Sequence, residues 1–371
     1  MLPEVTQFQD VVPLVNDTGV QFLDFALTLE PRKETGGEFA KLADDLLVRL
    51  LTNEEDGTTF YALLDRQWVP IPFFRHMPPH RFDEGPSNWS RMRLVELDTP
   101  DIDGHTHRLT LAFDTRSMPK REGTAYLAPN EEDVRSGETF KLALTPHEMG
   151  WFMDLAWVKE WLNDLYREGH SEMDQNELDD DIKALHPQAH YLNLLSLLWK
   201  PIPAERTQRK PKVRVPEVRL AGKDASQKTP ISVDLVLDVG NSRTCGILIE
   251  HHAQSGSGLK QNYVLELRDL VDPECVYTEP FESRVEFSQT FFGKDHLSVK
   301  SGRHDAFRWP TIARVGGEAN RLASRRRGTE GSTGLSSPKR YLWDGSRYTH
   351  GWRFNSAYVK ADKEPFATAA P

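Results

Sequence analysis

The sequence is poor in cysteine and has no long apolar run. Its 371 residues include two cysteines, Cys245 and Cys275. Two are too few for a disulfide framework and fit a reducing compartment. No stretch of about 18 apolar residues is present, so no transmembrane helix is expected. The start, M-L-P-E, lacks the basic and apolar segments of a secretory signal. We therefore expect a cytoplasmic protein with no membrane association.

Basic residues are scarce in the first half of the chain. Residues 1–200 hold 19 Lys and Arg against 36 Asp and Glu, a net charge of −17. Residues 201–371 hold 27 against 20, a net charge of +7. The acidic half argues against nucleic acid as the main partner, whereas the basic half suits anionic ligands. The difference also indicates separate domains, and the length predicts two or three of them at roughly 100–200 residues each.

Residues 1–200 are predicted to form an α+β N-terminal domain. Apolar and polar residues alternate over 20–27 and in a hairpin over 91–113, which predicts strands. Helical spacing of leucines predicts a helix over 40–51. A second helix is expected over 145–169, because its T-P-H-E start is a capping box with proline at the first helical position.

The tip of the predicted hairpin at 91–113 allows two interpretations. It reads D-I-D-G-H-T-H from Asp101 to His107. Two carboxylates and a His-x-His pair could form a metal cluster. The Asp-Gly pair is also ordinary turn composition, since glycine supplies the positive φ that the turn needs. The turn is the favoured interpretation, because no fourth ligand is evident.

Three tryptophans, Trp151, Trp157 and Trp161, lie on the predicted helix over 145–169. Aromatic residues at helical spacing are usually core. The alternative is a docking surface for a partner protein on this N-terminal domain. Both interpretations are carried forward, with core packing favoured.

Two further ranges have the composition of connecting chain. Residues 201–231 contain five prolines and eight lysines or arginines with little apolar periodicity, which predicts a semi-extended linker. Residues 355–371, which end in A-T-A-A-P, are expected to be a flexible tail. The range 232–354 between them is predicted to form a second domain.

The most informative stretch is V-D-L-V-L-D-V-G-N-S-R-T-C-G-I-L-I-E, from Val233 to Glu250. Two apolar runs flank a polar turn, which predicts a β-hairpin with largely buried strands. The turn gathers the groups that a phosphate and Mg²⁺ would need. These are a carboxylate for the metal, a glycine that admits close approach, free backbone N–H groups, hydroxyls and a cation. They belong to Asp238, Gly240, Asn241, Ser242, Arg243 and Thr244.

D-V-G-N-S-R-T-C-G-I-L-I-E resembles the first phosphate motif of the actin, sugar-kinase and heat-shock-chaperone ATPases. In those proteins an acidic residue, a glycine and small hydroxylated residues form a hairpin at the nucleotide phosphates. The resemblance implies ATP and Mg²⁺ as cofactors, with Asp238 at the metal. Gly240, Asn241, Ser242 and Thr244 would then be at the phosphates. Asn241 departs from the commoner threonine.

Two later segments extend this resemblance. V-G-G-E-A-N-R-L from Val315 is similar to a segment of the chaperone ATPases. Lys339-Arg340 is similar to their downstream Lys-Arg pair, which implies that Lys339 lies near the phosphates. No second D-x-G motif follows Gly240. The resemblance therefore implies an α/β fold with a partial, first lobe of an actin-like (ribonuclease-H-like) ATPase after the α+β domain. We expect the chain to be an N-terminal portion or a shortened form of such a protein.

The overall layout resembles the bacterial virulence-factor family SrfB. The shared features are the acidic N-terminal region, the Pro/Lys/Arg linker, and three motifs: D-V-G-N-S-R-T, A-R-V-G-G-E-A-N-R-L and S-S-P-K-R-Y-L-W-D. Two functions are expected, one from the stretch Asp238 to Thr244 and one from the acidic, tryptophan-rich N-terminal domain. One is an actin-like module that binds Mg-ATP. The other is a non-catalytic scaffold that keeps the fold and binds a partner protein. The sequence identifies no catalytic base, so enzyme activity stays open.

Overall fold

A computed structural model gives the fold of the chain, which is mixed α/β with more strand than helix. It describes residues 11–28, 39–41, 47–49, 64–77, 81–82, 85–120, 123–143, 146–199, 217–222, 232–251, 261–278, 280–293, 295–326, 331–344, 347–355 and 367–369. The chain forms two compact units. Unit 1 comprises Met1–Ala225 and Phe292–Phe307, and unit 2 comprises Ser226–Phe291 and Arg308–Pro371. Within the described ranges, no helix is long and apolar enough to cross a membrane.

The first sheet of unit 1 is antiparallel, with the order β2-β9-β8-β5. Its strands are β2 (Val20–Leu27), β5 (Val69–Pro70), β8 (Ser90–Glu96) and β9 (His107–Asp114). The sequence predictions of a strand over 20–27 and a hairpin over 91–113 are confirmed. Alternation succeeds here because the centre of one face of the sheet is apolar, with Met92 opposite Leu111 and both fully buried.

The second sheet of unit 1 has the order β1-β11-β10-β6-β7. Its strands are β1 (Val12–Val15), β6 (Phe73–Met77), β7 (Arg81–Phe82), β10 (Thr139–Leu142) and β11 (Val218–Ala221). Strand β11 lies inside the range 201–231 that the sequence predicts as a linker. It pairs in parallel with β1 and buries Val218 and Leu220 completely. Four residues of alternating character are too short a signal to separate from a basic, proline-rich background.

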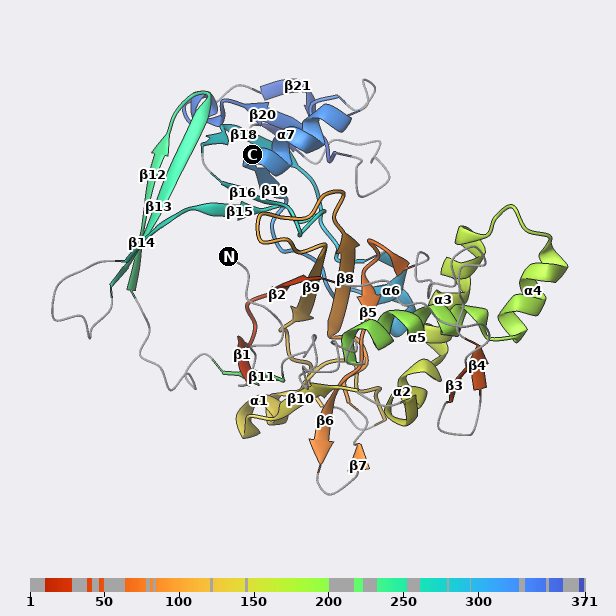
Figure 1. The fold of residues 1–371 in the computed structure, drawn as a ribbon. Helices are drawn as coiled ribbons and strands as arrows, with labels where there is room; N and C mark the ends of the chain where they lie inside the picture. The colour runs from red at the N-terminus through yellow and green to blue at the C-terminus, as the bar shows by residue number, and fades with distance from the viewer. Residues whose placement is uncertain are drawn as a thin grey trace. The chain divides into compact units, whose positions relative to one another are not determined.

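Five helices complete the N-terminal part of unit 1 (Figure 1). They are α1 (Glu131–Ser136), α2 (Pro146–Met153), α3 (Ala156–Gly169), α4 (Gln175–Lys183) and α5 (His186–Trp199). One continuous core joins both sheets to α2, α3 and α5. The single helix predicted over 145–169 is two helices, although it ends at Gly169 as expected; Thr145 lies outside the described residues. The predicted helix over 40–51 is wrong where it is described, because β3 (Phe39–Lys41) pairs with β4 (Leu47–Arg49).

Residues 292–307 lie between the two sequence segments of unit 2, but they fold as part of unit 1. They contain α6 (Asp295–Ser301), whose Leu297 is 1% exposed in the unit 1 core. The ring of Phe292 lies 5.0 Å from that of Phe22 and 5.5 Å from that of Trp68, both edge-on. The domain predicted over 232–354 is therefore interrupted by a segment that belongs to the other unit.

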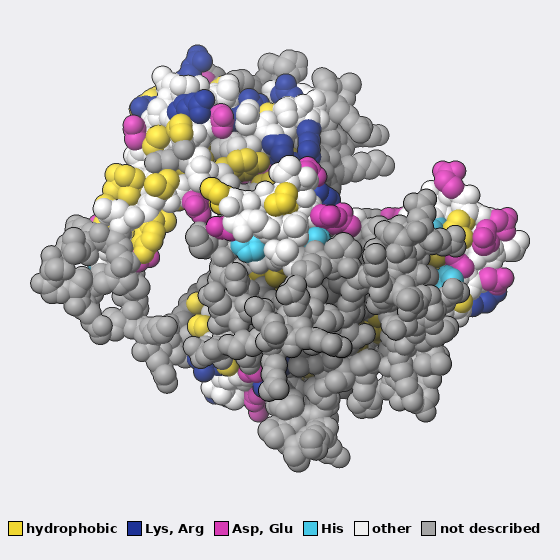
Figure 2. Space-filling model, viewed as in Figure 1, with side chains coloured by type: hydrophobic (Ala, Val, Ile, Leu, Met, Phe, Trp, Pro, Cys, Tyr) yellow, Lys and Arg dark blue, Asp and Glu magenta, His cyan; other side chains and the backbone are white. Residues whose placement is uncertain are grey.

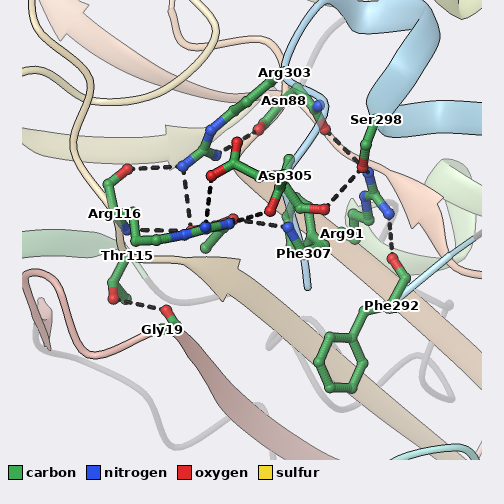
Figure 3. Close-up of polar contacts among 12 residues, drawn as sticks. Gly19, Asn88, Arg91, Thr115, Arg116, Phe292, Ser298, Arg303, Asp305 and Phe307 are labelled. Carbon is green, nitrogen blue, oxygen red and sulfur yellow. Dashed lines mark hydrogen bonds and ion pairs between the residues drawn. The ribbon is translucent and has the colours of Figure 1, made fainter. Parts of the chain in front are cut away.

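A buried polar network holds this segment in unit 1 (Figure 3). The carboxylate of Asp114 accepts from the guanidinium of Arg116 at 2.7 Å and from the backbone N–H of Phe307 at 2.7 Å. It also forms an ion pair of 3.2 Å with Arg303. Burial raises the pKa of Asp114, but Arg303 and Arg116 outweigh that effect and hold it below its ordinary value. Asp114 therefore stays charged, and its partners stay bound.

Arg91 extends the network, and its side chain is also completely buried. Its guanidinium donates to the carbonyl of Phe292 and, at 3.3 Å, to the hydroxyl of Ser298. It also lies 4.0 Å from the ring centre of Phe307. Each of these partners is on the inserted segment, so one arginine of β8 contacts both of its ends and its helix. Burial lowers the pKa of Arg91 to about 9, which leaves it charged at neutral pH.

The described residues of unit 2 form several small sheets and one α-helix of ten residues. Its hairpin sheet has the order β12-β13-β14, with β12 (Ser232–Val239), β13 (Arg243–His251) and β14 (Gln261–Val264), and a fourth strand, β17 (Phe281–Glu282), also pairs with β13. Its remaining elements are β15 (Glu266–Arg268), β16 (Val276–Thr278), β18 (Arg284–Phe287), β19 (Ala313–Val315), α7 (Gly316–Arg325), β20 (Gly334–Ser336), the 3₁₀ helix η3 (Pro338–Tyr341), β21 (Arg347–Trp352) and β22 (Ala367–Ala369). Strand β22 lies in the range predicted as a flexible tail.

The hairpin over 233–250 is confirmed, but its predicted burial is wrong. Every residue of β12 is exposed, and Leu235 and Val236 keep 52% and 53% of their surface accessible. The sequence suggested burial because continuous apolar runs are typical of strands covered on both faces. The hairpin has this apolar composition, but the side chains of β12 are exposed and no described layer of the fold buries them.

Candidate functional site

The turn between β12 and β13 is short and tightly closed. Strands β12 and β13 pair from Ser232 opposite His251 to Val239 opposite Thr244. The N–H of Gly240 then donates to the carbonyl of Arg243 at 2.9 Å. A Cβ at position 240 would lie 2.6 Å from that same oxygen, so the turn requires glycine. The sequence thus places glycine where the chain reverses.

Two backbone donors at the tip of this turn face solvent. Asn241 and Ser242 are exposed, and within the described chain their N–H groups donate to no protein acceptor. Consecutive free N–H groups in a turn form a concavity that favours anions. The tip of the turn therefore has two donors that no described residue occupies.

Ser283 fixes the turn from behind and was not predicted from the sequence. Its N–H donates to the carbonyl of Ser242 at 2.9 Å, and its hydroxyl donates to the carbonyl of Gly240 at 2.8 Å. Because that proton is used, the hydroxyl of Thr244 is the donor in the 2.8 Å contact between the two side chains. Ser283 is 43 residues from Gly240 in sequence, and no local pattern marks it.

Lys339 lies beside the same turn. Its Nζ donates to the carbonyl of Val239 at 3.3 Å, directly before Gly240. Helix η3 presents this lysine, and the residue before that helix, Ser337, donates its N–H to the carbonyl of Ser283 at 2.8 Å. One serine therefore links the lysine segment to the turn. Val239 and Lys339, which are 100 positions apart in sequence, therefore meet at this turn.

The predicted site residues divide between the two faces of the hairpin. Directly opposed residues point to the same side, so Thr244 shares a face with Val239. Asp238 and Arg243 lie on the other face, because Asp238 directly precedes Val239 and Arg243 directly precedes Thr244 along their strands. The hydroxyl of Thr244 is occupied by Ser283, which makes it a support for the turn. The groups open to a ligand are the carboxylate of Asp238, the tip N–H groups and two cations, Arg243 and Lys339.

A second cluster of charge in unit 2 surrounds helix α7, which the V-G-G-E-A-N-R-L segment forms. The buried carboxylate of Asp269 accepts from Arg321 at 2.6 and 2.7 Å and from the hydroxyl of Tyr277 at 3.0 Å. Glu318, 4% exposed, accepts from the N–H of Leu270 at 3.2 Å. Burial, with the charge of Asp269 added, raises the pKa of Glu318 to about 7.

The close approach of α7 to β16 explains the Gly-Gly pair at its start. A Cβ at Gly317 would lie 2.6 Å from the ring of Tyr277. The helix can therefore approach that ring only where a side chain is missing. These contacts make the α7 cluster an internal support of unit 2, and its carboxylates have partners in the fold.

The side chains of the alternative metal cluster, at the tip of the β8–β9 hairpin, already form hydrogen bonds within the protein. The carboxylates of Asp101 and Asp103 and a ring nitrogen of His105 lie within 4.8 Å of one another. The carboxylate of Asp101, however, accepts from Arg108 at 2.6 Å and from the N–H of His105 at 2.8 Å. His107 is buried and contacts the hydroxyl of Thr106 at 2.7 Å. These contacts match the turn interpretation of the sequence.

The tryptophans of α2 and α3 lie in the core of unit 1. Trp157 and Trp161 are 8% and 2% exposed, and Trp151 is partly buried against Phe74 at 5.1 Å. They offer little surface to a partner. Acidic residues of α4 are exposed nearby, among them Glu177 and Asp180, and Asp179 is partly exposed.

Comparison with known proteins places the chain in a family and gives no close structural relative. None of the curated proteins and none of the solved structures matches it. The family model described as virulence factor SrfB matches residues 1–371. Because that match extends over all the sequence given, the chain belongs to the SrfB virulence-factor family.

Proposed function

We propose that this SrfB-family chain binds the phosphate groups of a magnesium nucleotide, with ATP as the expected ligand, at the turn between β12 and β13. The observation that carries the proposal is the position of Lys339. Its Nζ lies 3.3 Å from the carbonyl of Val239, at the edge of a turn with two free N–H groups. A lysine beside a glycine-containing turn is a recurring way to bind phosphate.

The residues of the turn also fit Mg²⁺. Asp238 is exposed at the end of β12, and it shares a hairpin face with Arg243. Mg²⁺ keeps most of its water and is usually held by one or two carboxylates together with substrate phosphates. Asp238 would hold the ion through water, and the ion would neutralise phosphate charge. Gly240 and the tip N–H groups would orient the phosphates.

The same proposal extends to the fold of unit 2, as the first lobe of an actin-like ATPase. Support comes from the antiparallel order β12-β13-β14, with the glycine turn at one end. Further support comes from the later segment that returns a lysine to that turn. The proposal includes binding and leaves catalysis open, since no side chain at the turn is positioned as a general base.

Calorimetric titration of the chain with Mg-ATP tests this proposal. Wild type should bind, and Lys339→Ala should weaken binding about tenfold or more, since a hydrogen bond to a charged group contributes roughly 1.5–3 kcal/mol. Arg340→Ala is the matched control, because it removes an adjacent exposed cation and should have a smaller effect. Asp238→Asn should weaken binding with Mg²⁺ and leave binding in EDTA unchanged. No binding by wild type, or equal losses for both cations, would refute the proposal.

The second candidate function is a non-catalytic scaffold that binds a partner protein. It is favoured by the exposed apolar hairpin sheet of unit 2 and by the acidic surface of α4 in unit 1. A scaffold whose N-terminal domain binds a basic partner would lose that partner when Asp179 and Asp180 are changed to Asn. Purification of wild type and of the double variant Asp179→Asn, Asp180→Asn from cells, followed by identification of the proteins that co-purify with each, would show this loss. An unchanged set of partners would count against unit 1 as the docking surface.

A further inference from the structure

The β12-β13-β14 sheet exposes apolar side chains on both of its faces. Hydrophobic side chains gather along this sheet on the face that Figure 2 shows. They keep between 41% and 53% of their surface accessible: Val233, Leu235, Val236, Leu237, Val239, Ile247, Tyr263 and Val264. Contiguous apolar surface of this kind is unusual in soluble proteins and marks an interaction site.

The edge of this sheet is open as well. In the order β12-β13-β14, with β17 beside β13, strand β12 pairs on one side only among the described strands. Its other side presents the N–H and C=O groups of alternate residues, and at the end of the strand the carbonyl of Val239 also accepts from Lys339. Protein edges are usually protected by charge, proline or a bulge. Strand β12 has no proline, and its register with β13 is uninterrupted.

The sequence of β12 is the same in both directions. From Val233 to Val239 it reads V-D-L-V-L-D-V, with Val236 at the centre. Two antiparallel copies of such a strand are related by a two-fold axis through the central residue. A two-fold interface requires that if residue i contacts j, then j contacts i, which any antiparallel pair of identical strands satisfies. The palindrome adds that each residue faces its own type, leucine opposite leucine and valine opposite valine.

From this geometry we propose that β12 pairs antiparallel with β12 of a second copy of the chain. The two four-stranded hairpin sheets then become one sheet of eight strands, with the continuous order β14-β13-β12-β12-β13-β14 through its centre. In the symmetric register, Leu235 of each copy faces Leu237 of the other, and Val233 faces Val239. Cross-strand apolar neighbours at about 4.5–5.5 Å form a continuous row on one face. The proposal does not rest on nucleotide binding.

On the other face this register places Asp234 opposite Asp238 of the second copy. Directly opposed like charges are unfavourable in a sheet. The carboxylate of Asp234 lies 2.7 Å from the Nε2 of His251, a hydrogen-bond partner within its own hairpin. The opposed carboxylates repel each other, so the register predicts that neutralising Asp238 strengthens association.

Sedimentation velocity of the full chain without nucleotide tests the association. Wild type should be a dimer that dissociates on dilution. Leu235→Lys should weaken it about tenfold or more, because lysine replaces leucine at two symmetric positions. Leu342→Lys is the control, since Leu342 is equally open to solvent at 73% exposure but lies outside the sheet. A monomer at every concentration would overturn the proposal and assign the face to a different partner. Equal weakening by both variants would also overturn it.

Disulfide cross-linking tests the register. In a background in which Cys245 and Cys275 are changed to Ser, Val236→Cys places one thiol opposite its own symmetry mate. It should form an intermolecular disulfide under mild oxidation. Val264→Cys is the matched control, since it has the same 53% exposure but lies on β14 at the opposite edge. Equal cross-linking of both variants, or none in Val236→Cys under conditions where wild type is dimeric, would contradict the register. Asp238→Asn should tighten the dimer, and a looser dimer would contradict the register too.

Discussion

The β8–β9 hairpin of unit 1 and the β12–β13 hairpin of unit 2 are similar in length and rich in apolar residues. In β8 six of seven residues are buried, whereas in β12 all eight are exposed. Met92 and Leu111 meet across the first hairpin at 0% exposure. Leu235 meets Leu248 across the second, yet Leu235 remains 52% exposed. Apolar composition thus predicted correctly that both segments form strands, but it did not predict which strands are buried by the rest of the fold.

The difference lies in what packs on each hairpin within its own unit. The β8–β9 pair contributes to a core shared with a second sheet, three helices and the inserted segment 292–307. It also carries the buried charges that fasten this segment, at Arg91 and Asp114. The β12–β13 pair carries its charges at an exposed turn. The first hairpin is therefore part of the core of its unit, whereas the second exposes its apolar side chains and its turn to solvent.

The largest predicted contrast concerns the aspartates of the two hairpins. Asp114→Ala should lower the free energy of unfolding by about 3–5 kcal/mol, because it leaves Arg303 buried without its carboxylate. Asp238→Ala should change stability by less than about 0.5 kcal/mol, since Asp238 is exposed. Urea unfolding followed by tryptophan fluorescence measures both. Similar losses of unfolding free energy in Asp114→Ala and Asp238→Ala would contradict the distinction between a buried and an exposed hairpin.

The next contrast concerns leucines of the two hairpins. Leu111→Ala should cost about 2–5 kcal/mol, since a completely buried leucine leaves a cavity. Leu235→Ala should cost below about 1 kcal/mol under conditions where the chain is monomeric, because half of that side chain is already in water. Thermal and urea unfolding at low protein concentration give both values. If Leu235→Ala proved as costly as Leu111→Ala, the face of β12 would be covered in the monomer.

A smaller and pH-dependent effect is expected at Glu318. Its pKa is raised from 4.5 to about 7 in the folded state, so folding takes up a proton between those values. Stability should therefore fall as pH rises from 4.5 to 7 and stay reduced above that. Glu318→Gln should remove the penalty and stabilise unit 2 at pH 8 by on the order of 2 to 3 kcal/mol. Glu266→Gln, at an exposed glutamate, is the control and should leave the pH profile unchanged.

The sequence predicted elements whose signal is local. Strand β2 was located to the residue, the β8–β9 and β12–β13 hairpins were confirmed, and α3 ends at Gly169 as expected. Alternation and helix end signals depend on neighbours in sequence, so a single chain carries them in full. The family was also predicted from motifs, and the match over residues 1–371 bears it out.

The remaining features depend on contacts between distant residues. Leucine spacing over 40–51 fitted a helix, but the described residues of β3 and β4 pair as strands. Strand β11 is buried because β1, some 200 residues earlier, supplies its partner. Ser283 supports the turn through bonds to Gly240 and Ser242, and nothing around position 283 signals this. The assignment of 292–307 to unit 1 likewise depends on Arg91 and Asp114.

The central claim is that the exposed turn of β12–β13 binds phosphate. The most direct measurement is an amide NMR spectrum of the chain during titration with magnesium pyrophosphate. The largest shifts should occur at the N–H signals of Asn241 and Ser242, and Lys339→Ala should reduce them. The Asp101–His105 turn, whose carboxylate is already bonded to Arg108, is the internal reference and should not move. Unmoved signals at Asn241 and Ser242, or larger shifts at Asp101–His105, would contradict the account.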